Sequence, residues 1–314
     1  MPKTARGFKA ALMLGFEDSY GVTASPDGRM MPMNSCGLKK SRKLDTAATI
    51  TGSRNPAAPF SGNTDLAGQI VVPVDLFSMG WWLKAMFGAP ATAGTTTKTH
   101  TFKVADDQPS FWVETLINTD TPMFILSKGL KVAKFAMSVG GDNELVANID
   151  VMGAQQLRNA ASADATPTAT QFARLGNFQA AIKEGGATIG NCPAFSFTID
   201  CGLDGDTFCI GDGGVRGDLP EGQLAVSGTL TTLLKDAALL DKALNGTETS
   251  LELLFTAGAH SLKFTFNEVQ FEATSPVIEG PRGIRQEFNW QAYRDDHAAN
   301  SAVVVELVNN IASY

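Results

Sequence analysis

The residue types that usually carry enzyme chemistry are present in this chain, but their spacing does not suit a reaction. A nucleophile elbow needs Gly-x-Ser-x-Gly between a strand and a helix, and that pattern does not occur. No Cys-x-x-Cys pair occurs either, and no histidine has a cysteine or a second histidine at metal-ligand spacing. We therefore predict no catalytic residue, no metal ligand and no cofactor. The residues concerned are His100, His260, His297, Cys36, Cys192, Cys201 and Cys209.

We expect surface or hydrogen-bonded histidines, and we interpret Cys192, Cys201 and Cys209 as small core residues.

The loop LDGDTFCIGDGG, residues 203–214, brings three aspartates together as a calcium loop would. It lacks the third acidic position and the closing glutamate of an EF-hand, so we interpret it as a solvated turn. The basic stretch GLKKSRK, residues 37–43, could touch phosphate or a neighbouring subunit, although a solvated turn is the simpler interpretation.

Composition indicates an ordinary globular protein and argues against nucleic-acid binding. The chain has 314 residues, of which 44% are apolar and 18% charged, enough for one large domain or two smaller ones. The net charge of −7 leaves no basic surplus for gripping phosphates. The N-terminus lacks a secretory signal pattern, so we expect a protein made in the cytoplasm. The 31 glycines and 14 prolines separate short β-branched and aromatic runs, which favours a mainly β (α+β) fold.

The most apolar stretch is DLFSMGWWLKAMFGAP, residues 75–90. Its dozen or so apolar residues are too few to cross a membrane, which takes about 20. Asp75 suits the start of a helix, and Gly88 followed by Pro90 suits its end. The spacing of the apolar residues predicts a short helix whose apolar face packs in the core, and this face contains Leu76, Met79, Trp82, Leu83 and Met86.

The order of short patterns along the chain is repeated. GFKAALML at 7–14 resembles NFQAAI at 177–182, Cys-Gly-Leu occurs at 36–38 and 201–203, and a Gly-Gln strand begins at 68 and at 222. A second helix is predicted within TTLLKDAALLDKALNG, residues 231–246, with a core face of Leu233, Ala237, Leu240 and Leu244. We predict two tandem, similar β-barrel or sandwich units, each flanked by one short α-helix. They span residues 1–157 and 172–314, joined by a small-residue linker at 158–171.

Two of the predicted strands alternate between apolar and polar residues. In QEFNWQAY at 286–293 the polar positions are Glu287, Asn289 and Gln291, and in LVANIDV at 145–151 they include Asn148 and Asp150. Since successive strand residues point to opposite faces, each sheet should have one apolar and one polar face.

These features together resemble the tail tube proteins, or major tail proteins, of tailed bacteriophages. The resemblance covers most of the chain. It is carried by GFEDSYGV at 15–22, WWLKAMFGAP at 81–90 followed by TTTKTHTF at 95–102, RGDLPEGQLAVSG at 216–228, and the C-terminal stretch from 268 to 310.

The resemblance implies tail-tube-type units in a structural virion protein of the phage tail, assembled in the host cytoplasm and not an enzyme. It implies rings that stack into a tube through which double-stranded DNA is ejected without specific binding. Two units per chain favour a trimeric, pseudo-hexameric ring, with a hexamer as the alternative. Implied partners are a tape-measure protein and, where the tail has one, a sheath protein, with no membrane. The long loops 17–35 and 50–67 would contact the next ring.

Under this resemblance, the polar strand residues Asn148, Asp150, Glu287, Asn289 and Gln291 are candidates to face the lumen. They could equally face solvent or a subunit interface. The alternative function is a monomeric β-sandwich, either a binding or adhesin module or a virion decoration module. It would be a stable monomer with an exposed aromatic platform.

Overall fold

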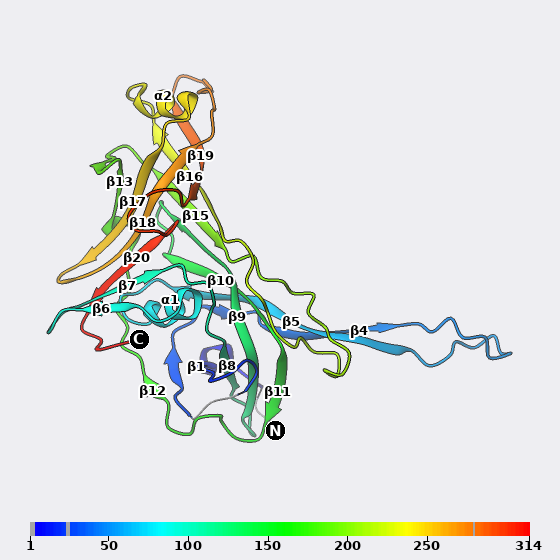
Figure 1. The fold of residues 1–314 in the computed structure, drawn as a ribbon. Helices are drawn as coiled ribbons and strands as arrows, with labels where there is room; N and C mark the ends of the chain where they lie inside the picture. The colour runs from blue at the N-terminus through cyan, green and yellow to red at the C-terminus, as the bar shows by residue number, and fades with distance from the viewer. Residues whose placement is uncertain (1–3, 23–25, 279) are drawn as a thin grey trace.

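The computed structural model describes residues 4–22, 26–278 and 280–314, and it is mainly β, as predicted (Figure 1). Residues 1–3 of the expected first unit, 23–25 of the first long loop and 279 of the expected second unit lie outside the described residues.

The first half contains η1 (Gly7–Lys9), β1 (Ala11–Phe16), β2 (Arg29–Met31), β3 (Ser35–Cys36), β4 (Lys39–Asp45), β5 (Phe60–Pro73), α1 (Met79–Phe87), β6 (Ala91–Ala93), β7 (Lys98–Lys103), β8 (Phe111–Ile117), β9 (Met123–Val139), β10 (Val146–Gly153) and β11 (Gln155–Asn159). The rest of the chain contains β12 (Thr168–Ala169), η2 (Asn177–Gln179), β13 (Ala180–Glu184), β14 (Ala187–Thr188), β15 (Ala194–Asp200), β16 (Ala225–Leu233), α2 (Ala238–Asn245), β17 (Thr249–Ala257), β18 (His260–Phe271), β19 (Arg285–Tyr293) and β20 (Val304–Asn309).

The strands pair in the same order twice along the chain. The first half pairs β1, β8, β9, β10, β5 and β3 in succession. The second half pairs β13, β17, β18, β19, β16 and β15 in succession. The pairings are antiparallel, and β9 also pairs with β15, which joins the two halves into one sheet. The division into two tandem units stays a prediction.

The largest apolar cluster contains buried residues of both halves. Phe135 of β9 lies 6.0 Å from Phe197 of β15 between ring centroids, and Phe197 lies 5.0 Å from Phe264 of β18. All three rings are no more than 1% exposed. The two halves therefore share a core instead of burying separate ones.

The predicted first helix is α1, and its expected core residues Leu76, Met79, Trp82, Leu83 and Met86 are all buried. The helix begins at Met79 with Ser78 at its N-cap, three residues after the predicted cap Asp75. Asp75 instead closes the preceding turn, because its Oδ1 accepts hydrogen bonds from the N–H groups of Phe77 at 2.6 Å and Ser78 at 2.7 Å. Leu76 is thus a core residue of the turn before the helix.

The predicted second helix is present as α2, but its predicted core face is wrong. Helix α2 begins at Ala238, so Leu233 belongs to the end of β16 and Ala237 precedes the helix. Leu233 and Leu244 are 39% and 56% exposed, Leu240 is half-buried, and Ala243 is the buried residue of α2. The physical reason is that the helix starts only after β16 ends at Leu233, so the face that α2 turns to the core, at its end of the molecule, is that of Leu239 and Ala243 (Figure 1).

The segment 158–171, predicted as a linker, lies against the first half of the chain. Asp164 Oδ2 accepts a hydrogen bond from Gly28 N–H at 2.9 Å, and Ala163 N–H donates to Glu114 at 2.8 Å. Strand β12 at the end of the segment pairs with β2. These contacts fix the segment, so it does not act as a free tether.

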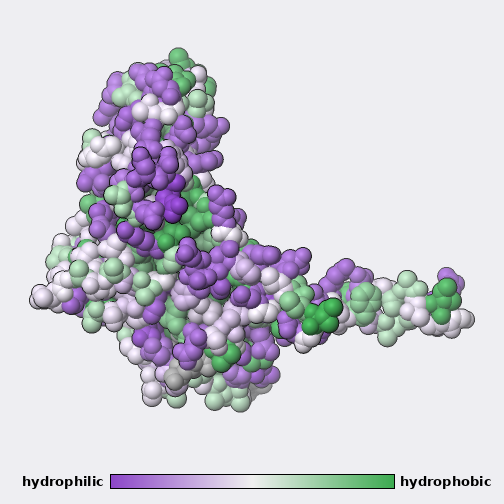
Figure 2. All heavy atoms as spheres, in the orientation of Figure 1, coloured by the Kyte–Doolittle hydropathy of each residue, from purple (hydrophilic) through white to green (hydrophobic). Residues whose placement is uncertain are grey.

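Strands β4 and β5 form a hairpin arm, residues 39–67, that projects from the body (Figure 1). Six of the seven β4 residues are exposed. The arm also exposes large apolar side chains: Leu44 is 67%, Ile50 96% and Phe60 56% exposed, and hydrophobic residues stand out along the arm in Figure 2. Exposed apolar side chains on a projecting arm are typical of a surface that contacts another protein.

Candidate functional site

The candidate site is the polar face of the sheet formed by β5, β10, β9, β15, β16 and β19. Burial alternates along β10 and β19 as predicted, with Phe288 and Trp290 turned to the core. Residues directly opposite in the register share a face. Asn148, Ala136, Thr198, Ser227 and Gln291 form one such row across five strands.

The structure places all five predicted polar residues on this one face. Asp150 lies opposite Lys134, which lies opposite Asp200. Asn289 lies opposite Thr229 and Glu287 opposite Thr231, in rows next to that of Gln291. The two strands singled out from the sequence therefore belong to a single surface that crosses the junction of the halves.

Hydrogen bonds and one ion pair order the side chains of this polar face. Lys134 Nζ contacts Asp200 at 2.8 Å, Gln69 donates to Asp150 Oδ1 at 2.9 Å, and Asn289 donates to Glu272 at 2.7 Å. The hydrogen bond to Asp200 raises the pKa of Lys134. Partial burial acts to raise the pKa of Asp200, but the hydrogen bonds from Lys134 and the Gly202 N–H outweigh it and lower that pKa.

The polar face is hollowed and negatively charged. An open hollow of about 780 Å³ lies between β15, β16, β18 and β19, lined in part by Ser196, Thr229, Asn289 and Gln291. Asp150, Asp200, Glu272 and Glu287 supply four carboxylates to the face, against two cationic side chains, those of Lys134 and Arg285. Such a surface presents hydroxyls and amides with an excess of negative charge, which repels phosphates.

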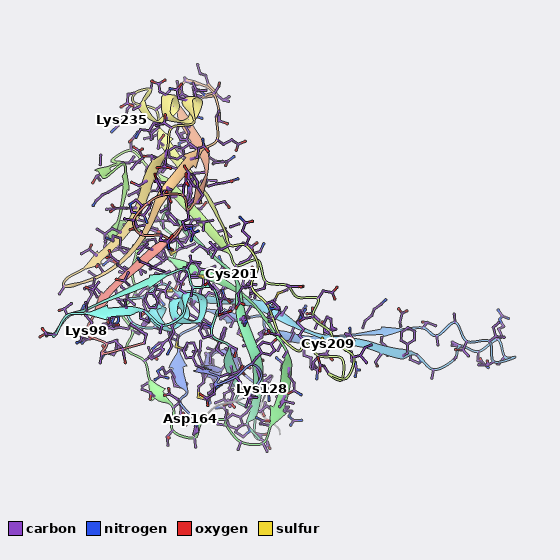
Figure 3. All side chains as sticks on the ribbon, in the orientation of Figure 1. Lys98, Lys128, Asp164, Cys201, Cys209 and Lys235 are labelled. Carbon is purple, nitrogen blue, oxygen red and sulfur yellow. The ribbon has the colours of Figure 1, made fainter. Side chains whose placement is uncertain are left out.

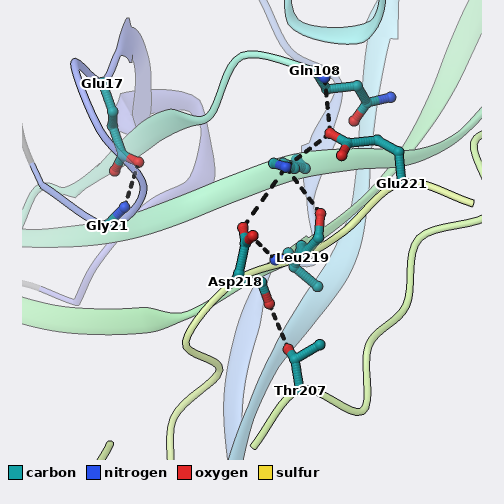
Figure 4. A network of polar contacts seen from close by, with 8 residues as sticks. Glu17, Gly21, Gln108, Thr207, Asp218, Leu219 and Glu221 are labelled. Carbon is teal, nitrogen blue, oxygen red and sulfur yellow. Dashed lines mark hydrogen bonds and ion pairs between the residues drawn. The ribbon is translucent and has the colours of Figure 1, made fainter. Parts of the chain in front are cut away.

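The loop 203–221 covers one end of this face, and Lys131 of β9 holds it there through Leu219 and Glu221, which are labelled in Figure 4. Lys131 is only 7% exposed, and its Nζ donates to the Leu219 carbonyl at 2.9 Å and to Glu221 at 2.8 Å. Glu221 also accepts a hydrogen bond from Gln108 N–H at 2.8 Å. A buried ammonium with these partners fixes the loop on the first half of the chain.

Arg216 holds the same loop at the base of the arm. Its guanidinium is 6% exposed and donates to the carbonyls of Gly153 at 3.1 Å and Leu66 at 3.3 Å. It also donates to Gly205 at 2.7 Å and pairs with Asp65 at 2.5 Å. Sequence reasoning missed this role, because the Arg216 guanidinium binds carbonyls of Leu66 and Gly153, which lie far from it in the sequence.

The cysteines only partly match the prediction of small core residues. Cys201 is buried, and burial raises its pKa to about 12. Cys192 is half-buried, with a pKa raised to about 11 for the same reason. Cys209 is exposed in the loop beside the arm, so the prediction is wrong there (Figure 3). Cys209 stands at a turn, where its carbonyl accepts the Asp212 N–H at 3.4 Å, and this part of the loop lies outside the core.

A model of the phage tail tube protein family matches residues 7–292, nearly the whole chain. The chain therefore belongs to the phage tail tube protein family. A sequence comparison with curated proteins finds no significant match. The family is one of structural phage tail proteins and not a class of enzymes, and the chain is accordingly a structural component of the virion. Among the described residues, no helix is long and apolar enough to cross a membrane.

Proposed function

We propose that this protein assembles into rings that stack into the phage tail tube, with the polar face of the β5-β10-β9-β15-β16-β19 sheet lining the channel. The observation that carries the proposal is that this polar face is continuous across both halves of the chain. A curved wall made of many such sheets would present hydroxyls, amides and carboxylates to the lumen. DNA would then slide without specific binding, because the carboxylates repel its phosphates.

Two halves with the same order of strand pairing favour a ring of three chains with six similar sectors, and a hexamer of whole chains is the alternative. Ring closure would pair strand edges that otherwise invite aggregation. The arm and the remaining loops would contact neighbouring subunits, including those of the next ring. A tape-measure protein inside the tube and, in a sheathed tail, a sheath protein outside it complete the proposed partners. Assembly would take place in the host cytoplasm.

The test is charge reversal on the lumen face with Asp150→Lys and Glu287→Lys in one phage. Both residues lie on the polar face, so tubes should still form while DNA ejection is impaired by attraction between the new ammonium groups and phosphates. A matched control is Asp106→Lys with Asp107→Lys, which makes the same charge change at two exposed residues of the loop between β7 and β8. Normal infectivity of the first double variant would exclude this face as the lumen lining.

A further inference from the structure

The pairing of β9 with β15 shows how one half of the chain meets the other. Residues 134–139 of β9 run antiparallel to residues 200–195 of β15, from Lys134 opposite Asp200 to Val139 opposite Phe195. The Cys201 N–H bond to the Ala133 carbonyl makes Lys134 and Asp200 a non-hydrogen-bonded pair. In the alternation that follows, Ile199 N–H points toward β9, whereas Ser138 N–H points away from β15.

A shared bulge gives the residue correspondence between the halves. In β9, Leu130 and Ser127 lie opposite Phe111 and Val113, so the two β9 residues between them face a single β8 residue. In β18, Val269 and Phe266 lie opposite Thr249 and Leu251 in the same way. Leu130 therefore corresponds to Val269.

Following the register outward from this bulge makes Gly68 of β5 correspond to Gly228 of β16. A Cβ at Gly68 would meet the Gly37 carbonyl oxygen, and one at Gly228 would meet the Ser196 carbonyl oxygen. Both glycines thus allow the backbone of the neighbouring strand to approach closely. Because Gly37 and Ser196 supply the carbonyl oxygens at these two contacts, Gly37 corresponds to Ser196. The Gly-Gln and Cys-Gly-Leu matches in the sequence are offset from this register by six residues.

With this correspondence, β15 residues 195–200 match residues 36–41 of β3 and β4. Residues 272–277, which follow β18, match residues 134–139 of β9, because Glu272 N–H donates to the Asn289 carbonyl as the pairing continues. Each half therefore contains one segment equivalent to β9 and one equivalent to β15. Inside the chain, only β9 of the first half and β15 of the second half pair with each other.

We propose that residues 272–277 of one chain pair antiparallel with residues 36–41 of a second copy, in the register that β9 and β15 adopt inside the chain. Val277 then lies opposite Cys36, and Glu272 opposite Ser41. This inference rests on the proposed assembly and assigns the two strand edges that join its subunits.

Both edges are open in the described part of the chain. Strand β4 pairs on one side only, with β5, and residues 272–276 are mostly exposed, as is Val277 at 67%. Lys40 corresponds to Ile199, and its N–H likewise points to the free side, where it donates to the Gln156 side chain at 3.3 Å. That side chain would give way to the neighbour's backbone.

Proline and charge fit the same register. Pro276 corresponds to Ser138, whose N–H points away from β15, so the missing donor costs no bond in the junction. Inside the chain the junction carries the Lys134–Asp200 ion pair. Between chains the charges would be exchanged. The acidic Glu272 takes the place of Lys134, and it faces Ser41, which has Lys39 and Lys43 as its neighbours on the same face of the strand. Diagonal pairs of this kind lie within reach of long side chains.

The first test uses Val277→Cys together with the native Cys36, in a Cys209→Ser background. Opposed residues have Cα atoms about 4.5–5.5 Å apart, within the range of a disulfide. Mild oxidation of assembled tubes should link successive chains into a ladder that ends at the number of chains in the ring. Ile278→Cys is the matched control, since Ile278 is also an exposed apolar residue, 75% exposed, but is one residue out of register. Its ladder should be much weaker.

The second test needs no variant. A zero-length carbodiimide linker applied to wild-type tubes built from mixed isotope-labelled and unlabelled chains should join Glu272 of one chain to Lys39 or Lys43 of another. Tubes that form without this link and without the Val277→Cys ladder would overturn the edge assignment while leaving assembly intact. Failure of the wild-type protein to assemble would instead contradict the proposed function, and a ladder no stronger than that of Ile278→Cys would overturn the register.

Discussion

Substitution of Phe197 by alanine tests whether the two halves form one cooperative body. Phe197 is 1% exposed, and its ring lies 5.0 Å from Phe264, 5.3 Å from Phe266 and 6.0 Å from Phe135 of the first half. Removing a ring from such a site leaves a cavity and costs about 3–5 kcal/mol. Since the core is shared, the whole chain should lose this stability in one transition.

Guanidinium unfolding of the unassembled protein, followed by tryptophan fluorescence and by far-UV circular dichroism, measures this loss. With an m-value of about 5 kcal/mol per M, the midpoint should fall by roughly 0.6–1 M in both signals. Three of the four tryptophans, Trp81, Trp82 and Trp112, belong to the first half. If their fluorescence transition stays in place while the circular dichroism splits in two, the halves unfold separately and the reasoning is refuted. Phe178→Ala is the control, because that ring is 90% exposed and its loss should change stability by less than about 0.5 kcal/mol.

Three further substitutions test single contacts. Arg216→Ala leaves the Gly153 and Leu66 carbonyls without their donor. It should lower the free energy of unfolding by about 3 kcal/mol and speed proteolysis of loop 203–221. Arg158→Ala, at an exposed side chain of β11, should do neither. Glu268 accepts the N–H groups of Asp295, Asp296 and His297, which lower its pKa below the usual value of 4.5. Its stabilising effect is therefore full above that pH and is lost on acidification through the folded pKa. Glu268→Gln should therefore lower the melting temperature at pH 7, with a smaller difference below about pH 4. Burial raises the pKa of Asp75, so Asp75→Asn, which keeps the acceptor for Phe77 and Ser78, should be milder than Asp75→Ala, which should cost about 1–3 kcal/mol in thermal unfolding.

Local features of the fold could be predicted from the sequence because they depend on local periodicity. The alternation in β10 and β19 placed Asn148 and Asn289 on the polar side, and the apolar spacing around Trp82 identified the buried α1. The core face of the second helix failed because an amphipathic spacing does not reveal how far the preceding strand extends: β16 runs to Leu233, and α2 begins only at Ala238.

Features that depend on long-range register could not be predicted. The order of the repeated patterns matches the repeated strand pairing, yet short glycine-containing matches gave an offset of six residues where the bulges relate Gly68 to Gly228. No local pattern specifies pairings between residues far apart in the sequence. The β9–β15 junction and the hydrogen bonds of Lys131 and Arg216 are pairings of this kind.

Electron cryomicroscopy of the purified protein after assembly tests the central claim most directly. The account predicts a hollow tube of stacked rings in which β10, β9, β15, β16 and β19 line the channel, with Asp150, Glu287 and Asn289 facing the lumen. A monodisperse monomer under all assembly conditions, as a monomeric binding or decoration module would give, would contradict it. A tube whose channel is lined by a different face of the chain would contradict it equally.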